Sequence, residues 1–160
     1  MIILGIDPGT ATTGYGIIQI KKGASPRLIE YGCITTPKRN RPEKRLTEIY
    51  KDLKKLIKKH KPGLLAVESL FFFKNLKTAI SVAQARGVVL LCASESKIKI
   101  AEFAPLEVKM SLTSYGRADK KQVQYMVKKL LGLKNAPKPD DAADALAVAI
   151  CASSRLSFQA

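Results

Sequence analysis

The chain has 160 residues, 46% of them hydrophobic, and its 28 lysines and arginines against 13 acids give a formal net charge of +15. This length predicts a single domain, 1–160, with a substantial core. No apolar run approaches the ~20 residues of a membrane span, and the N-terminus lacks the pattern of a secretory signal. We therefore expect a cytoplasmic protein without membrane contact. Such a basic excess attracts polyanions, and nucleic acid is the usual one.

The first predicted strand is the apolar run 2–6, which ends in Asp7 and a Pro8-Gly9 turn. A carboxylate at the exit of a buried strand needs a cationic partner, and a metal ion is one candidate. Alternatively, Asp7 only caps the turn, as Asx residues often do. This stretch alone does not separate the two interpretations.

The next segments alternate between strand and helix patterns. Three β-rich runs separated by turn residues predict an antiparallel meander of strands at 2–6, 14–20 and 27–36. An amphipathic helix is predicted over 41–60, and Lys61-Pro62-Gly63 ends it. The following buried strand, 64–68, again ends in a carboxylate, that of Glu68.

The helix predicted after residue 75 is apolar on all sides, which indicates burial within the chain or between two subunits. Ala79, Ala83 and Gly87 are small residues at four-residue spacing, so another helix can approach them closely. A dimer contact through this helix is therefore a hypothesis.

A fifth strand is predicted at 97–103, and helices follow around 106–114 and 119–131. The alanine-rich segment 137–150 predicts a last helix with Pro139 in its first turn. This order of elements predicts an α/β fold with a mixed five-stranded sheet flanked by helices.

The last helix carries three further acids. Asp141 and Asp144 are three residues apart and share a face, while Asp140 is rotated from Asp141 by about 100°. The helix macrodipole explains an acid in the first turn, which accounts for Asp140 and can also account for Asp141. It explains Asp144 poorly, because an acid on an otherwise apolar helix needs a partner.

If Asp7, Glu68, Asp141 and Asp144 converge, they cannot all stay ionised without a compensating cation. An all-oxygen cluster suits Mg²⁺ or Mn²⁺, and two such ions ~4 Å apart can clamp a phosphoryl group during in-line displacement. The only histidine, His60, is interpreted as an exposed helix cap, which leaves no histidine-based triad or zinc site. Together with the basic charge, the acids predict metal-dependent phosphodiester hydrolysis.

The basic residues are concentrated in two stretches, 37–61 and 109–138, which predict two basic surfaces. The first contains eleven lysines and arginines, Arg45 among them, against three acids. Contact with phosphates is the favoured interpretation, and solvated helix faces are the alternative.

Five motifs follow one another along the chain: GIDPGT at 5–10, TGYG at 13–16, VE at 67–68, QARG at 84–87 and DAADALA at 141–147. As an ordered set they resemble the RuvC-type Holliday junction resolvases. The resemblance implies a ribonuclease H-like fold and a homodimer that makes paired incisions at a four-way DNA junction, in homologous recombination and DNA repair. Ligatable 5′-phosphate and 3′-hydroxyl nicks, two Mg²⁺ per subunit with Mn²⁺ as a substitute, and a branch-migration helicase complex as partner are also implied.

The resemblance assigns metal binding and catalysis to Asp7, Glu68, Asp141 and Asp144. It also implies an aromatic residue that stacks on junction bases just after the second acid, at Phe71, Phe72 or Phe73. The alternative for these rings is packing against the next helix. Basic family positions fall on Lys109 and Lys120, with Lys121 adjoining them, and imply phosphate contact, unless these lysines are simply solvated.

Three other functional classes remain open. An actin-like kinase or ATPase uses a similar turn after its first strand, but normally needs two such domains. An architectural DNA-binding module explains the basic charge but not the acids, which repel DNA. A ribonuclease H that cuts RNA–DNA hybrids shares the metal chemistry, so only the substrate distinguishes it.

Overall fold

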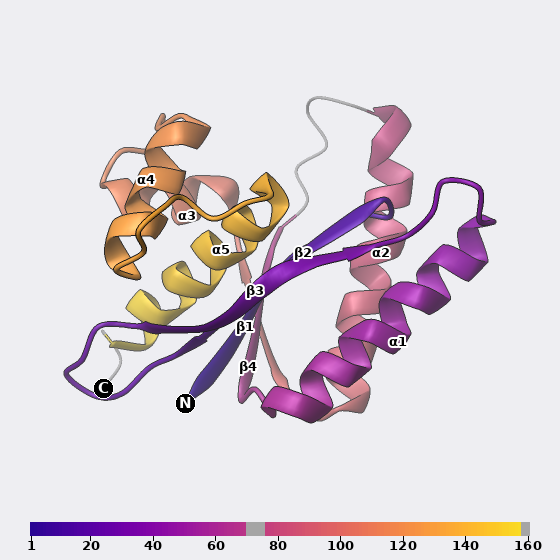
Figure 1. Ribbon diagram of the computed structural model, residues 1–160, viewed down its shortest axis with the longest axis horizontal. Helices are drawn as coiled ribbons and strands as arrows, with labels where there is room; N and C mark the ends of the chain where they lie inside the picture. The colour runs from indigo at the N-terminus through magenta and orange to yellow at the C-terminus, as the bar shows by residue number, and fades with distance from the viewer. Residues whose placement is uncertain (70–75, 158–160) are drawn as a thin grey trace.

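The computed structural model describes residues 1–69 and 76–157, and Figure 1 shows their arrangement. In chain order the elements are β1 (Ile2–Asp7), β2 (Thr12–Gln19), β3 (Arg27–Thr35), α1 (Pro42–His60), β4 (Leu64–Glu68), α2 (Leu76–Glu95), β5 (Lys99–Phe103), α3 (Pro105–Thr113), α4 (Lys120–Leu130) and α5 (Asp140–Ser157). The predicted order of strands and helices is confirmed.

The five strands form one sheet in the order β3-β2-β1-β4-β5. β1 pairs with β2, and β2 with β3, in antiparallel fashion, whereas β1–β4 and β4–β5 are parallel pairs. The mixed five-stranded sheet is therefore confirmed, with β1 in its centre. A central strand is covered on both faces, which explains why 2–6 is apolar throughout.

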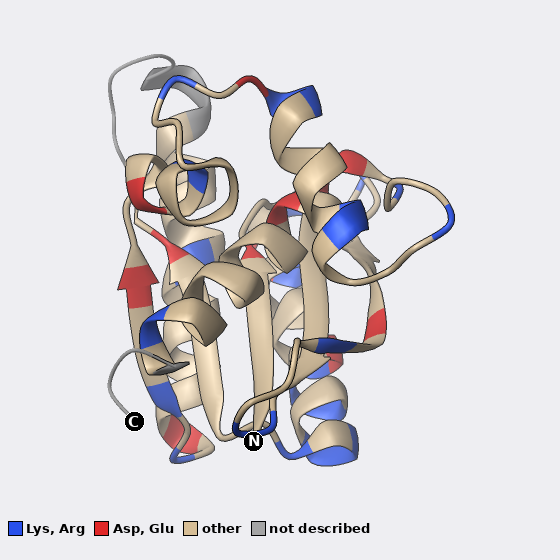
Figure 2. Ribbon diagram, turned by 90° about the vertical axis from the view of Figure 1, so that its left-hand side faces the viewer, with Lys and Arg blue, Asp and Glu red and all other residues tan. Residues whose placement is uncertain are grey.

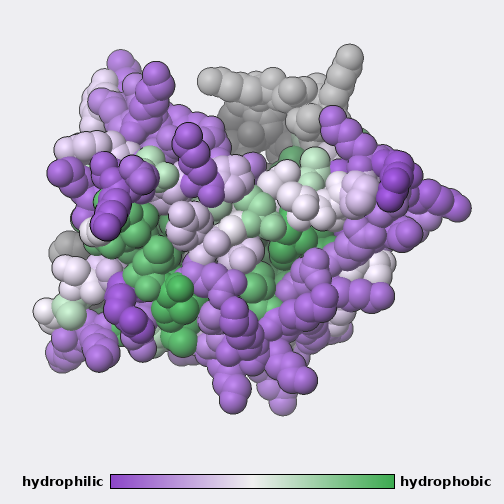
Figure 3. Space-filling view, viewed as in Figure 1, coloured by the Kyte–Doolittle hydropathy of each residue, from purple (hydrophilic) through white to green (hydrophobic). Residues whose placement is uncertain are grey.

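Helices cover both faces of the sheet, with α1 and α2 on one side and α3, α4 and α5 on the other (Figure 1). Successive residues of β1 point to opposite faces, so Leu4 and Ile6 pack with α1 and α2, and Ile3 packs with the other three helices. On the face seen in Figure 3, green hydrophobic side chains form a band between hydrophilic edges.

α5 lies unusually close to the sheet because glycines face it. A Cβ atom added to Gly5 would lie only 2.1 Å from the backbone oxygen of Ala145, and one added to Gly16 would lie 2.6 Å from Leu146 Cδ2. The alanine-rich sequence of α5 completes this contact from the helix side. The backbone of α5 is thereby fixed against β1 and β2.

Three local predictions were wrong. β5 begins at Lys99 because Lys97 has a left-handed backbone with φ of 55°. α5 begins at Asp140, so Pro139 precedes the first turn instead of forming it. His60 is not an exposed cap: its side chain is only 10% exposed and its Nε2 lies 3.1 Å from Glu30 Oε2, because α1 packs beside β3.

Charged segments lie mostly on the outer helices, loops and edge strands, while the middle of the sheet is largely uncharged (Figure 2). Within residues 1–69 and 76–157, no helix is long and apolar enough to cross a membrane.

Candidate active site

Asp7 and Glu68 end neighbouring parallel strands at the same level. Ile6 pairs with Val67 across β1 and β4, so the next residue of each strand is one of the two acids. Ile6 and Val67 both pack toward α1 and α2. Because side chains alternate along a strand, Asp7 and Glu68 both face α5.

The first turn of α5 brings Asp141 to these strand ends. Gly14 pairs with Asp7, and a Cβ atom at Gly14 would lie 2.0 Å from the backbone oxygen of Asp141. Asp140 has different surroundings, because it is exposed and accepts a hydrogen bond from Gln124 Nε2 at 3.0 Å. Asp141, not Asp140, therefore belongs to the group around Asp7.

The four acids Asp7, Glu68, Asp141 and Asp144 lie within electrostatic reach of one another. Burial and, in decreasing order of importance, the neighbouring carboxylates of Asp144, Glu68 and Asp141 together raise the pKa of Asp7 from its ordinary 3.8 to about 7. Burial also raises the pKa of Glu68 and of Asp144. This cluster therefore carries negative charge that is poorly solvated and mutually repulsive.

Two of the three predicted DNA-binding lysines lie beside these acids. A cavity of about 220 Å³ is lined by Glu68, Lys109, Lys120 and Asp144 among others. The Lys120 ammonium lies 2.9 Å from Asp144 Oδ2 and 3.3 Å from an oxygen of Asp140, and Lys109 opposes the rise in the pKa of Glu68. Lys121 lines a different cavity.

The three phenylalanines predicted to stack on DNA bases, Phe71, Phe72 and Phe73, lie outside the described residues.

The donor atoms of the four acids fit hard divalent cations, which prefer carboxylate oxygens. Their unbalanced charge also favours a cation, because among the residues that the structure describes only Lys109 and Lys120 oppose it. In the described part of the chain, no group of three or more acidic, histidine or cysteine side chains is already arranged around a single ion position. One reason is that Asp144 is paired with the Lys120 ammonium.

A hydrogen-bonded chain that the sequence did not reveal holds the loop after Asp7. The buried Thr36 donates from Oγ1 to the backbone oxygen of Thr10 at 2.5 Å, and Arg45 Nε donates to the same Oγ1 at 2.7 Å. Thr13, also buried, donates to the Gly9 oxygen at 2.7 Å. Arg45 had appeared only as one of many basic residues, because no sequence pattern links α1 to this loop.

A second connection holds the end of β4. Arg86 of α2 donates from Nε to the backbone oxygen of Glu68 at 3.4 Å and forms an ion pair with Glu102. The QARG motif at 84–87 drew attention to this arginine without indicating its contact. Both strand ends that carry acids are thus fixed by arginines from helices on the opposite face.

The raised pKa of Asp7 predicts how stability depends on pH without divalent metal. Between about pH 4 and 7 the folded chain keeps a proton on Asp7 that the unfolded chain loses, so the free energy of unfolding falls as pH rises. Asp7→Asn removes this penalty. We expect the stability of the variant relative to the wild type to increase by on the order of 2 kcal/mol between pH 5 and pH 8.

Urea denaturation in the presence of a chelator measures this difference. Asp140→Asn is the matched control, because Asp140 is exposed and its pKa is lowered by Gln124 and Lys120. The difference in the free energy of unfolding between this control and the wild type should not change between pH 5 and 8. A constant gap between wild type and Asp7→Asn over this range would contradict the prediction.

Comparisons with known proteins identify the family of the chain. The model of the family "Crossover junction endodeoxyribonuclease RuvC" matches residues 3–152. The chain is 53% identical over 154 residues to the RuvC endonuclease of Moorella thermoacetica, covering 96% of the chain and 92% of the relative. It is 54% identical over 151 residues to that of Syntrophomonas wolfei, covering 94% and 87%.

Solved structures are similar as well. Thermus thermophilus RuvC in complex with a Holliday junction substrate superposes with a TM-score of 0.93 at 32% identity, covering 99% of this chain and 96% of that one. A yeast mitochondrial Holliday junction resolvase shares the fold at 15% identity, with a TM-score of 0.65 and coverage of 93% and 77%. The ribonuclease H-like fold expected from the motifs is thereby confirmed, and the chain belongs to the RuvC family of crossover junction endodeoxyribonucleases.

Proposed function

We propose that this protein resolves four-way DNA junctions by paired, symmetric incisions in homologous recombination and DNA repair. The observation that carries the proposal is the meeting of four acids from β1, β4 and α5 next to two lysines. Membership of the RuvC family and the similarity to a RuvC structure bound to a Holliday junction support it. A cytoplasmic location is part of this proposal.

Asp7, Glu68, Asp141 and Asp144 would hold two Mg²⁺ ions, or Mn²⁺ in their place. When bound, such ions supply a nucleophilic water and stabilise the oxygens of the phosphate under attack. Hydrolysis then breaks the bond between phosphorus and the 3′ oxygen, which leaves a 3′-hydroxyl and a 5′-phosphate that a ligase can rejoin.

Lys109 and Lys120 face the same cavity as Glu68 and Asp144, and we assign them to the phosphates beside the cut. Lys120 shares its ammonium between Asp144 and Asp140, so it can turn toward a phosphate and free Asp144 for a cation. In this paired position the two carboxylates raise the pKa of Lys120 against the effect of burial. Lys121 and the phenylalanines 71–73 remain predicted DNA contacts.

A homodimer is proposed through α2. Within one chain this helix leaves Ile80 71% exposed and Leu91 54% exposed, which a second copy would cover. Two active sites related by symmetry suit paired cuts in two symmetry-related strands of a four-way junction. A branch-migration helicase complex that delivers the junction remains a proposed partner.

The substrate test compares a mobile four-way junction, linear duplex and RNA–DNA hybrid, each with Mg²⁺ or with chelator. We expect Mg²⁺-dependent, symmetric cutting of the junction alone. Asp7→Asn, Glu68→Gln, Asp141→Asn and Asp144→Asn should each abolish cleavage while junction binding stays equal or tightens, because less negative charge faces the DNA.

Asp140→Asn is the control for this series and should keep cutting, since Asp140 faces solvent. Full activity of Asp141→Asn would instead assign metal binding and catalysis to Asp140. Preferential cutting of the hybrid would replace the proposal with a ribonuclease H, and binding without any nicking would indicate an architectural protein.

The dimer prediction is tested by sedimentation equilibrium. We expect a dimer at micromolar concentration and a shift toward monomer in Leu91→Glu, which places a charge on the exposed side of α2. Leu106→Glu is a control on α3 with 60% exposure and should leave the dimer intact. Wild-type protein that sediments only as monomer would remove the dimer from the proposal.

Arg45 is predicted to position the Asp7 loop and not to bind DNA. Arg45→Gln and Thr36→Val both interrupt the series of hydrogen bonds that runs from Arg45 through Thr36 to the Thr10 oxygen. Each variant should therefore slow single-turnover cleavage about tenfold while the Kd for the junction changes little. The double variant should be no slower than either single one.

Lys44→Gln serves as the control, because it removes the neighbouring exposed charge without touching the loop. If Arg45→Gln weakened junction binding in proportion to the loss of rate, Arg45 would be a phosphate contact instead.

A further inference from the structure

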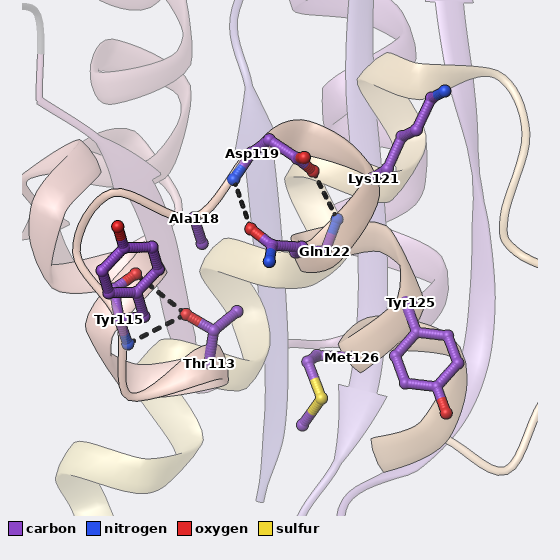
Figure 4. A pocket seen from close by; sticks show the side chains of 8 residues that line it. All are labelled: Thr113, Tyr115, Ala118, Asp119, Lys121, Gln122, Tyr125 and Met126. Atoms are coloured by element: carbon purple, nitrogen blue, oxygen red, sulfur yellow. Dashed lines mark hydrogen bonds between the residues drawn. The ribbon is translucent and has the colours of Figure 1, made fainter.

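A second cavity, separate from the acids, lies between α3 and α4. Its volume is about 540 Å³, within the range of specific ligand pockets. Figure 4 shows the side chains that line it: Thr113, Tyr115, Ala118, Asp119, Lys121, Gln122, Tyr125 and Met126. Tyr115 and Tyr125 are 54% and 55% exposed, which is unusual for two large rings at one pocket.

The two sides of α4 separate this pocket from the proposed active site. Lys120 and Gln124 contact the acids at the start of α5. Lys121 follows Lys120 and is rotated by about 100° around the helix, so it faces the pocket instead. Tyr125 and Lys129 follow at four-residue spacing and continue this outward stripe.

The walls of the pocket are held in place without a ligand. Asp119 Oδ1 accepts from the Gln122 backbone N–H at 2.8 Å, and Gln122 Oε1 accepts from the Asp119 N–H at 2.8 Å. Across the pocket, the Thr113 hydroxyl accepts from the Tyr115 N–H at 3.1 Å. These bonds, dashed in Figure 4, fix both ends of the loop between the helices.

The charge around the pocket is positive and not neutralised. The two acids of this helix pair serve as caps, Glu107 at the start of α3 and Asp119 at the start of α4. Three cations belong to this region: Lys121 lines the pocket, Lys129 Nζ lies 5.5 Å from the Tyr125 ring centre, and Arg117 is exposed in the loop two residues after Tyr115. None of them forms an ion pair with any residue that the structure describes.

We propose that the α3–α4 pocket docks a partner protein through an acidic peptide segment that carries a pair of bulky apolar side chains. This pair would enter between Tyr115, Tyr125 and Met126, and flanking carboxylates would pair with Lys121, Lys129 and Arg117. Tyrosine and arginine are typical of residues that dominate protein interfaces. Duplex DNA would offer phosphates to the same cations, but its stacked bases expose no bulky apolar group that could enter between Tyr115, Tyr125 and Met126.

The test uses a short fluorescein-labelled peptide in which aspartates flank a Phe-Leu pair, with fluorescence anisotropy as the readout. Tyr125→Ser and, separately, Tyr115→Ser should weaken its binding to the full chain about tenfold. Both side chains are exposed, so the variants should fold, and their junction cleavage should match the wild type. Tyr31→Ser on β3, which is 37% exposed, should bind the peptide normally.

A peptide with Ser-Ser in place of Phe-Leu should bind about tenfold more weakly than the original. Equal binding of both peptides, or no effect of either tyrosine variant, would overturn the proposal, since only unspecific charge attraction would remain. If instead a labelled single-stranded oligonucleotide or the junction lost affinity in Tyr125→Ser, the pocket would be a nucleic-acid site and the peptide proposal would be wrong.

Discussion

The backbone of α5 rests on glycines of β1 and β2, and this contact brings the acids of α5 to those at the strand ends. Gly5, Gly14 and Gly16 leave no side chain between strand and helix, so the first turn of α5 lies at the ends of the strands. An added methyl group at Gly14 would meet the backbone of Asp141 itself. Backbone cannot move aside as a flexible side chain can, so these three positions constrain both stability and the site.

The same packing creates an electrostatic cost. Burial and three neighbouring carboxylates raise the pKa of Asp7 to about 7. Ionisation of this group therefore lowers the free energy of unfolding. The scaffold tolerates the cost because the acids sit on elements fixed elsewhere: Thr36 and Arg45 hold the loop after β1, and Arg86 holds the end of β4. A site of repelling charges needs rigid support, and arginines placed outside it provide that support without neutralising it.

Much of this arrangement was predictable from local sequence patterns. Apolar runs that end in Asp7 and Glu68 marked two strand ends, and helical spacing placed Asp141 and Asp144 on one face. Sequence could not show that β1 and β4 are neighbours in matching register, because strand pairing depends on tertiary contacts between distant segments. For the same reason it missed the partner of His60 on β3 and the bond from Arg45 to Thr36, both of which join distant elements.

α4 illustrates why charge alone is a poor guide to function. Lys120 and Lys121 are adjacent and chemically identical, and sequence assigned both to DNA phosphates. In the fold, one pairs with Asp144 beside the strand ends, whereas the other lines a pocket with two exposed tyrosines. The 100° step of the helix separates them, so a single short helix presents one basic face to the acids and another to solvent. Adjacent lysines on one helix can therefore lie in different surroundings and serve different contacts.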